Sequence, residues 1–292
     1  MKPRLLIVTI LLTTTAARAQ TSTFGGESYA WAGNIGWIEL RPDRPVTGDG
    51  IVVADTHLSG YAWSANCGWI NFGDGTPGAS IRYSNTTGTD SGVNHDGAGN
   101  LSGLAWSANC GWINFGWAAP ADPSRPRFSL LTGAFTGYAW ASNLGWITLG
   151  TGLLTTGSMC VPDSDADGLS DHWERQFAGT LAVLTATGDS DGDGASDLAE
   201  YHADTNPTDP LAKFDILNFQ RGATASTLTW TSRPTRLYRL ELSQDLSAWS
   251  DSLLGLISPD AGATTTRAAT HADLARCFFQ VEPILPLSGV KP

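Results

Sequence analysis

Apolar and polar positions follow three different patterns along this chain. Between residues 24 and 150, one motif occurs four times: YAWAGNIGWIEL (29–40), YAWSANCGWINF (61–72), LAWSANCGWINF (104–115) and YAWASNLGWITL (138–149). Residues 163–210 are dominated by Asp and Gly, and residues 212–286 return to short apolar alternations. Strict alternation over a few residues is typical of β-strands. The pattern therefore predicts two β regions with a different kind of segment between them.

Each copy of the motif is predicted to form a β-hairpin, because aromatic and β-branched residues flank a turn in which Gly can adopt positive φ. Folding the second copy about Asn66 places Trp63 opposite Trp69. The same face then carries Tyr61 and Asn71. The opposite face carries Ala62, Ile70 and Phe72.

The spacing of the copies predicts an array of similar units. Candidate strands at 51–57, 92–95 and 127–131 precede the last three copies, so each unit is expected to be a three-stranded meander. The first copy lacks such a strand. It is expected to be a cap, or else the array closes by borrowing a strand from elsewhere.

The eight Trp of the motifs are expected to form the hydrophobic stack between units. The alternative is a sugar-binding surface on which aromatic rings stack. The better exposed candidates for that role are Trp117, Tyr29, Tyr61 and Tyr138.

These motifs resemble the GYAWSxNxGWIxF repeats of exported bacterial proteins. The resemblance covers about half of the chain and implies a surface or extracellular location. The N-terminus agrees with export, since Lys2 and Arg4 precede an apolar run (5–12) and a small-x-small site at Ala17–Ala19. We expect a signal peptide over 1–19 and a secreted or cell-surface chain, the alternative being an uncleaved anchor. No later segment is apolar enough to predict a membrane span.

The Asp/Gly segment contains two twelve-residue blocks, DSDADGLSDHWE (163–174) and DSDGDGASDLAE (189–200). Each has acidic residues at positions 1, 3, 5, 9 and 12 and Gly at position 6, which is the spacing of an EF-hand calcium loop. The predicted ligands of the first loop are Asp163, Asp165, Asp167, Leu169 through its carbonyl, Asp171 through water, and Glu174. Those of the second loop are Asp189, Asp191, Asp193, Ala195, Asp197 and Glu200. Oxygen ligands in this number favour Ca²⁺ over Mg²⁺.

Charge supports this interpretation. Residues 160–211 contain ten Asp, two Glu and one Arg, so they carry the whole net charge of −11. The rest of the chain has 16 acidic and 16 basic residues, which gives no sign of nucleic-acid binding. The alternative is a solvated linker that binds no metal. A short helix is expected after each loop and no helix before it, which favours a structural role over a calcium switch.

With the TNPTDP spacer (205–210), the segment resembles bacterial thrombospondin type 3 repeats. The resemblance implies calcium binding at both loops. In such a segment binding and folding are one process, because without metal the Asp side chains repel one another.

Four Cys in an exported chain allow disulfides. Cys67 and Cys110 hold the same position in two motifs, so a Cys67–Cys110 bond is plausible, and Cys160–Cys277 would then be the second. All three connectivities remain open from sequence, as do four free thiols.

Residues 212–286 are expected to form a small β-sandwich with Trp230 and Trp249 in its core. The candidate strands are 214–219, 226–231, 237–242, 252–257, 264–270 and 277–281. The segment resembles the C-terminal sandwich module that follows calcium repeats in exported bacterial proteins. Residues 287–292 are expected to be a tail.

The fold expected is therefore mainly β: a four-copy hairpin or meander array (20–159), an EF-hand-like calcium joint (160–211) and a small sandwich. No GxSxG, HExxH or P-loop motif occurs, the five His are scattered, and NHDGAGN (94–100) is expected to be a simple turn. We therefore expect a non-enzymatic, calcium-stabilised structural or adhesive protein. The alternatives are a carbohydrate-binding protein using its Trp residues and a secreted hydrolase with an unrecognised site. Glycans or other surface proteins are the expected partners.

Overall fold

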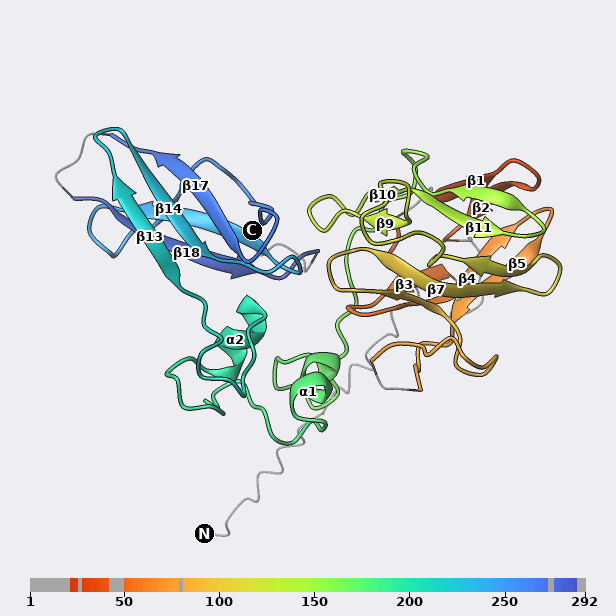
Figure 1. The fold of residues 1–292 in the computed structure, drawn as a ribbon, viewed down its shortest axis with the longest axis horizontal. Coiled ribbons are helices and arrows are strands. Elements are labelled where there is room, and N and C mark those ends of the chain that lie inside the picture. The colour runs from red at the N-terminus through yellow and green to blue at the C-terminus, as the bar shows by residue number, and fades with distance from the viewer. Residues whose placement is uncertain (1–21, 26–27, 42–49, 79–80, 273–275, 288–292) are drawn as a thin grey trace, which may run out of the picture.

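The computed structural model describes residues 22–25, 28–41, 50–78, 81–272 and 276–287. The predicted signal peptide (1–19) and residues 288–292 of the predicted tail lie outside the described residues. The described chain is mainly β, with two short helices between two β units (Figure 1). Neither of these helices is long and apolar enough to cross a membrane.

The first β unit is an eight-stranded antiparallel barrel built from four hairpins. The hairpins are β1 (Tyr29–Ala32) with β2 (Gly36–Glu39), β4 (Leu58–Ser64) with β5 (Gly68–Gly73), β7 (Leu101–Ser107) with β8 (Gly111–Asn114), and β11 (Tyr138–Ala141) with β12 (Gly145–Thr148). Neighbouring hairpins pair in the order β2-β1-β12-β11-β8-β7-β5-β4, and β2 also pairs with β4. The sheet therefore closes on itself. The expectation of a cap or a borrowed strand was wrong, because β12 pairs directly with β1.

Short strands lie beside this barrel. β3 (Gly50–Val53) pairs with β4 and β6 (Val93–His95) pairs with β7, as a meander requires. β9 (Arg127–Phe128) pairs in the same way with β10 (Phe135–Thr136), which leads through Gly137 into β11, so the third expected upstream strand also lies beside its hairpin. At its ends the chain enters and leaves the barrel side by side, because Gly157 donates its N–H to the Thr23 carbonyl over 3.1 Å.

The barrel interior is filled by the small and medium residues of the motifs. The buried residues are Ala30, Ala32, Ile38, Leu40, Ala62, Ile70, Phe72, Ala105, Ile113, Phe115, Ala139, Ala141, Ile147 and Leu149. The predicted register is confirmed, with Trp63 opposite Trp69 and Tyr61 opposite Asn71.

The Trp pairs lie on the outer face of the barrel. Seven of the eight indoles are 38–49% exposed, and paired rings have centroids 4.7–4.9 Å apart. The expectation that these Trp form a stack between units was therefore wrong. Strand alternation places all Trp on the face opposite Ala and Ile, and an eight-stranded barrel has an interior just wide enough for such smaller side chains.

A ring of side-chain hydrogen bonds joins the four hairpin turns. The turn Asn of each hairpin donates its Nδ2 to the carbonyl of the buried turn residue in the neighbouring hairpin. The four bonds are Asn34 to Leu144 (3.1 Å), Asn66 to Ile35 (3.0 Å), Asn109 to Cys67 (2.9 Å) and Asn143 to Cys110 (3.2 Å). The Asn of each motif therefore ties its turn to the next around the barrel.

The predicted Cys67–Cys110 disulfide is confirmed, and it links two neighbouring turns in this ring. The expected Cys160–Cys277 bond does not form, and both thiols are free. Cys160 instead extends the barrel sheet, donating its N–H to the Val53 carbonyl over 2.8 Å.

The second β unit contains two three-stranded sheets. One has the order β13 (Ile216–Arg221), β14 (Ala225–Thr231), β17 (Thr264–Thr270), and the other β16 (Ser250–Asp251), β15 (Leu237–Ser243), β18 (Phe278–Ile284). Trp230 is fully buried between them, packed against Tyr238 with centroids 5.8 Å apart. Trp249 is only partly buried, so its expected place in the core was wrong.

Candidate metal centres

The two acidic loops connect the β units and place their carboxylates as the sequence spacing predicts. In the first loop, carboxylate oxygens of Asp163, Asp165 and Asp167 all lie within 4.8 Å of one another. Gly168 has φ of +96°, a conformation that glycine adopts without strain. Backbone N–H groups orient the ring of carboxylates: Gly168 donates to Asp163 over 3.1 Å and Leu169 donates to Asp167 over 2.9 Å.

The second loop repeats this arrangement. Asp189, Asp191 and Asp193 form the equivalent triplet within 4.8 Å, and Gly194 has φ of +98°. Both oxygens of Asp189 accept from backbone N–H groups, and Ala195 donates to Asp193 over 2.7 Å. Two loops with different intervening residues thus converge on the same geometry.

Buried carboxylate oxygens without a partner lie in both loops. Glu174 is 0% exposed and neither of its carboxylate oxygens has a hydrogen-bond partner. Glu200 is 2% exposed; Thr205 donates to its Oε1 over 3.1 Å, while its Oε2 has no partner. One oxygen each of Asp167 and Asp191 is also buried and unpaired. A buried, unpaired carboxylate is costly, and such charges normally coordinate a metal or pair with a cation.

Both Glu residues show the effect of this crowding on their pKa. Burial, together with the negative charges of Asp165 and Asp167, raises the pKa of Glu174 to about 7. Burial and the charges of Asp191 and Asp193 raise the pKa of Glu200 to about 7. A cation within either triplet would reverse this effect by favouring the ionised carboxylates. The donor set consists of hard oxygen ligands, which fits a calcium ion.

The Asp residues at loop position 9, Asp171 and Asp197, accept hydrogen bonds from the beginning of each loop and are not members of the triplets. Asp171 accepts two hydrogen bonds of 2.6 Å from the N–H and hydroxyl of Ser164. Asp197 accepts two of 3.0 Å from Ser190 and a third from the N–H of Thr185. These carboxylates brace the beginning of each loop. Their water-mediated contact with a cation stays a prediction, as does ligation by the carbonyls of Leu169 and Ala195.

Each loop leads into a short helix, α1 (Asp171–Phe177) or α2 (Asp197–Ala203). Ser170 and Ser196 cap the helices, and no helix occurs in residues 150–170. As expected, the helices pack together, with the Trp173 ring 5.3 Å from Phe177 and 5.4 Å from Tyr201. Leu169 and Leu184 complete this small core.

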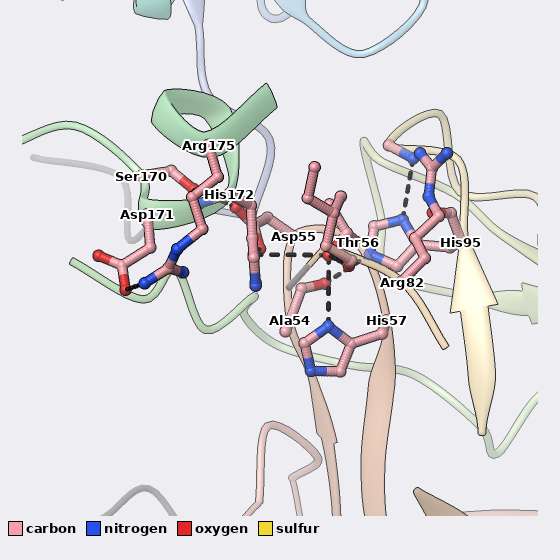
Figure 2. Close-up of polar contacts among 12 residues, drawn as sticks. Ala54, Asp55, Thr56, His57, Arg82, His95, Ser170, Asp171, His172 and Arg175 are labelled. Carbon is pink, nitrogen blue, oxygen red and sulfur yellow. Dashed lines mark hydrogen bonds and ion pairs between the residues drawn. The ribbon is translucent and has the colours of Figure 1, made fainter. Parts of the chain in front are cut away.

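Helix α1 is bonded to the barrel through Asp55, in the loop after β3 (Figure 2). The hydroxyl of the cap residue Ser170 donates to Asp55 Oδ2, and the His172 ring bonds Asp55 Oδ1. Asp55 is largely buried; burial opposes its ionisation, but these bonds and the nearby imidazoles lower its pKa overall. Ser170 therefore acts as a helix cap and a tie to the barrel.

Two more His surround the same barrel loop. Thr56 Oγ1 lies 3.3 Å from His57 Nδ1 and 3.4 Å from His172 Nδ1. His95 is buried and bonds the Ala54 carbonyl through Nε2. The His are scattered along the sequence, but His57 and His172, 115 positions apart, lie together here with ring centroids 5.4 Å apart. In the NHDGAGN segment, Asn94 and His95 belong to β6, and the expected turn follows at 96–99, where Asp96 accepts from the Ala98 and Asn100 N–H groups.

Helix α2 is bonded to the sandwich. Arg236 donates to the carbonyl groups of Tyr201 (2.6 Å) and His202 (2.9 Å) at the end of the helix. Thr235 donates its hydroxyl to Asp204, the residue that ends the helix in a left-handed conformation. Lys213 reaches the second loop, with Nζ 3.0 Å from the Asp193 carbonyl. A cavity of about 330 Å³ lies where the three parts meet, lined in part by Asp55, Trp173 and Arg236.

In comparisons with protein-family models, curated proteins and solved structures, the chain matches none of them. The described geometry therefore defines this protein as an eight-stranded barrel and a second β unit, joined by two acidic loops that could each hold a metal ion.

Proposed function

We propose that this chain is an exported, calcium-binding structural or adhesive protein in which calcium makes the joint between its two β units rigid. The observation that carries the proposal is the burial of Glu174 and Glu200 beside the two Asp triplets, with carboxylate oxygens that have no partner. Two independent loops share this feature. A solvated linker would instead expose its carboxylates and pair them with water.

Calcium fits these loops better than magnesium does. Each loop offers three clustered Asp carboxylates and a buried Glu with an unpaired oxygen, and calcium accepts six to eight oxygen ligands. Magnesium prefers a tighter octahedron and retains its waters. The resemblance of these loops in sequence to EF-hand loops and to thrombospondin type 3 repeats supports the proposal of calcium binding.

The role as a joint follows from the two sets of bonds that flank the loops. The helix after the first loop is bonded to the barrel at Asp55, and the helix after the second is bonded to the sandwich at Arg236. Trp173 and Tyr201 hold the two helices together. Ordering both loops therefore fixes a continuous path of contacts from one β unit to the other.

Export is proposed on the N-terminal sequence pattern and suits the calcium sites. Calcium loops of extracellular modules have dissociation constants of about 10⁻⁴–10⁻³ M, close to calcium concentrations outside cells. The adhesive role is proposed because two β units held at a fixed distance can present a binding surface away from an attachment point. No catalytic step is proposed, since Ser170 and His172 both bond Asp55 and join the helix to the barrel.

Calorimetric titration of the mature chain with calcium tests this function. We expect two calcium ions per chain. Glu174→Gln and Glu200→Gln should each remove or strongly weaken one site, while Glu282→Gln, an exposed Glu of the sandwich, serves as the matched control and should retain both. The proposal fails if the unmodified chain binds no calcium at millimolar concentration.

A further inference from the structure

The outer face of the barrel repeats one arrangement of side chains four times. In one copy, which crosses four neighbouring strands, Trp112 lies opposite Trp106, Trp106 opposite Asn71, and Asn71 opposite Tyr61. We call such a line of four outward-facing residues an aromatic row. The other rows have the same order of two Trp, one hydrogen-bonding side chain and one further residue. Their third places are taken by Thr148, Glu39 and Asn114.

Each aromatic row combines residues from two neighbouring motifs, so no single motif reveals it. The stagger between hairpins places the polar residue of one hairpin beside the first Trp of the next. A row four strands wide spans about 14 Å, given the spacing of about 4.8 Å between strands. That length suits a short oligosaccharide segment rather than one small molecule.

The aromatic members of a row present accessible ring surface. Trp106 and Trp112 are each 41% exposed and Tyr61 is 43% exposed. Among the described residues, no hydrogen bond is formed by the indole N–H of Trp106 or Trp112, so both can donate to a ligand.

Two of the four polar members are held in a fixed orientation. Asn71 Oδ1 accepts from the Gly73 N–H over 2.8 Å, and Asn114 Oδ1 accepts from the Gly116 N–H over 2.7 Å. Because Oδ1 is used by the backbone, the side-chain amide cannot rotate freely, and its Nδ2 is left to donate outward beside an indole ring. Pre-organised donors of this kind lower the entropic cost of binding.

One row lacks the Tyr at its fourth place and has an additional Trp at its other end. Leu104 replaces the Tyr of the row that contains Asn114. At the opposite end of that row, Trp117 packs against Trp146 with centroids 4.6 Å apart, held by a bond from its Nε1 to the Tyr138 carbonyl. The row therefore keeps three aromatic rings.

We propose that the aromatic rows bind neutral glycans, with sugar rings stacked on the Trp and Tyr faces and hydroxyl groups bonded to the polar member of each row. None of the sixteen row positions is Lys or Arg, and one is Glu39, so the surface does not complement an anionic polysaccharide. A protein or membrane partner would favour a continuous apolar patch, whereas here a polar side chain interrupts every row. Pyranose rings, with C–H faces and hydroxyl rims, match this alternation.

Among the described residues, the Trp of the rows keep much of their surface accessible. The hairpin turns extend away from the sandwich and from both helices, toward the right in Figure 1. Four similar rows on one rigid barrel can engage one polymer at several points, which raises overall affinity without any new contact. This inference does not depend on calcium binding at the joint.

The test is affinity electrophoresis of the mature full-length chain in gels that contain laminarin, hydroxyethylcellulose or galactomannan, with polygalacturonate as the anionic polymer. We expect retardation by at least one neutral polysaccharide and none by polygalacturonate. The decisive variant is Asn71→Asp with Asn114→Asp, since Asp still accepts from Gly73 and Gly116 but cannot donate. It should keep the melting temperature and weaken binding about tenfold, as expected for loss of contacts central to an interface.

Trp106→Phe should retain part of the binding and Trp106→Ala should lose it, whereas Leu253→Ala, which changes a 91% exposed residue of the sandwich, should bind normally. Four results would overturn the proposal. The first is no retardation by any neutral polymer, and the second is equal retardation by polygalacturonate. The third is unchanged binding by the double Asn variant. The fourth is shielding of the Trp by self-association or by phosphatidylcholine vesicles, without glycan binding.

Discussion

Withdrawal of calcium is expected to unfold the two loops and their helices while both β units stay folded. Each helix has seven residues, and isolated helices of this length are unstable in water. Their shared core consists of four buried side chains, of which Leu169 and Leu184 belong to loops rather than helices. Without a cation, the same core would have to keep Glu174 and Glu200 buried against neighbouring Asp charges. We therefore expect the local structure to depend on the metal.

The magnitude follows from two linked sites. A ligand stabilises the state that binds it by RT ln(1 + [L]/Kd), so 1 mM calcium at a Kd of about 0.1 mM contributes about 1.4 kcal/mol at each site. Because Trp173 and Tyr201 couple the helices, both sites stabilise one unit, which gives about 3 kcal/mol in total. Amide exchange from α1 and α2 should accelerate by about 100-fold when calcium is removed.

Hydrogen–deuterium exchange read by mass spectrometry checks this expectation in 1 mM calcium and in EGTA. Peptides covering 171–177 and 197–203 should lose protection together, and peptides from β4–β5 and β14–β17 should not change. Glu200→Gln should reduce protection in both helices, since they share one core. Equal protection of the helices in EGTA would refute the reasoning, as would an equal loss from the barrel.

Three further predictions concern the contacts around the joint and the barrel. Arg236→Ala removes two charge-assisted hydrogen bonds at the end of α2 and should destabilise the contact between α2 and the sandwich by about 3 kcal/mol. Amide hydrogen exchange at residues 201–204 measures this loss. Arg236→Lys should recover only part of the stability, because lysine lacks the forked donors of arginine. Burial, with His172 nearby, lowers the pKa of His57 from 6.5 to about 4, so the folded barrel holds this ring neutral. The contribution of His57 to folding stability is therefore present above pH 6.5 and is lost as the pH falls toward 4, by up to about 3 kcal/mol. Because Asp55, His95, Asp74 and His172 face the same ring, the contribution of His57 is isolated by comparing the denaturant unfolding of His57→Asn with that of the unmodified chain at each pH. Parallel pH profiles of the two proteins would contradict this prediction. Cys67→Ser with Cys110→Ser opens a loop with a sequence separation of 43 and should cost up to about 4 kcal/mol, while thiol titration of the unfolded, unreduced chain should find two thiols, Cys160 and Cys277.

Local patterns predicted much of this molecule correctly. The alternation within YAWSANCGWINF fixed the opposition of Trp63 and Trp69, and the Asp spacing predicted both carboxylate triplets. These features depend on residues close in sequence, where strand and loop geometry leave few alternatives.

Sequence reasoning failed where the outcome depends on closure of the barrel. The Trp were expected to stack between units, but the interior of a small barrel is filled by smaller side chains, mainly Ala and Ile, so the Trp remain on the outer face. The hydrogen bonds from Asn34, Asn66, Asn109 and Asn143 also arise only once the turns meet in a ring. Their shared position in every motif was a signal that could have revealed them.

The bonds on either side of the joint were likewise beyond the reach of local patterns. Asp55 and His172 are 117 positions apart, and Arg236 lies 35 positions beyond Tyr201. No periodicity connects such residues. The isolated Asp55, in an otherwise uncharged stretch after β3, was the one visible sign that a partner would be needed.

The ring of turn hydrogen bonds has a consequence for how such a domain can arise and change. Every hairpin gives one bond to a neighbour and receives one from the other neighbour, so all four junctions carry the same turn bond. One junction also carries the Cys67–Cys110 disulfide, and the chain enters and leaves the barrel at another. The curvature of the closed sheet then sets the number of hairpins, and insertion of a fifth hairpin would open the circle. A gene that grew by duplication of one hairpin would gain a stable product when the circle closed, and the shared turn bonds would have allowed any of the four junctions to be its beginning.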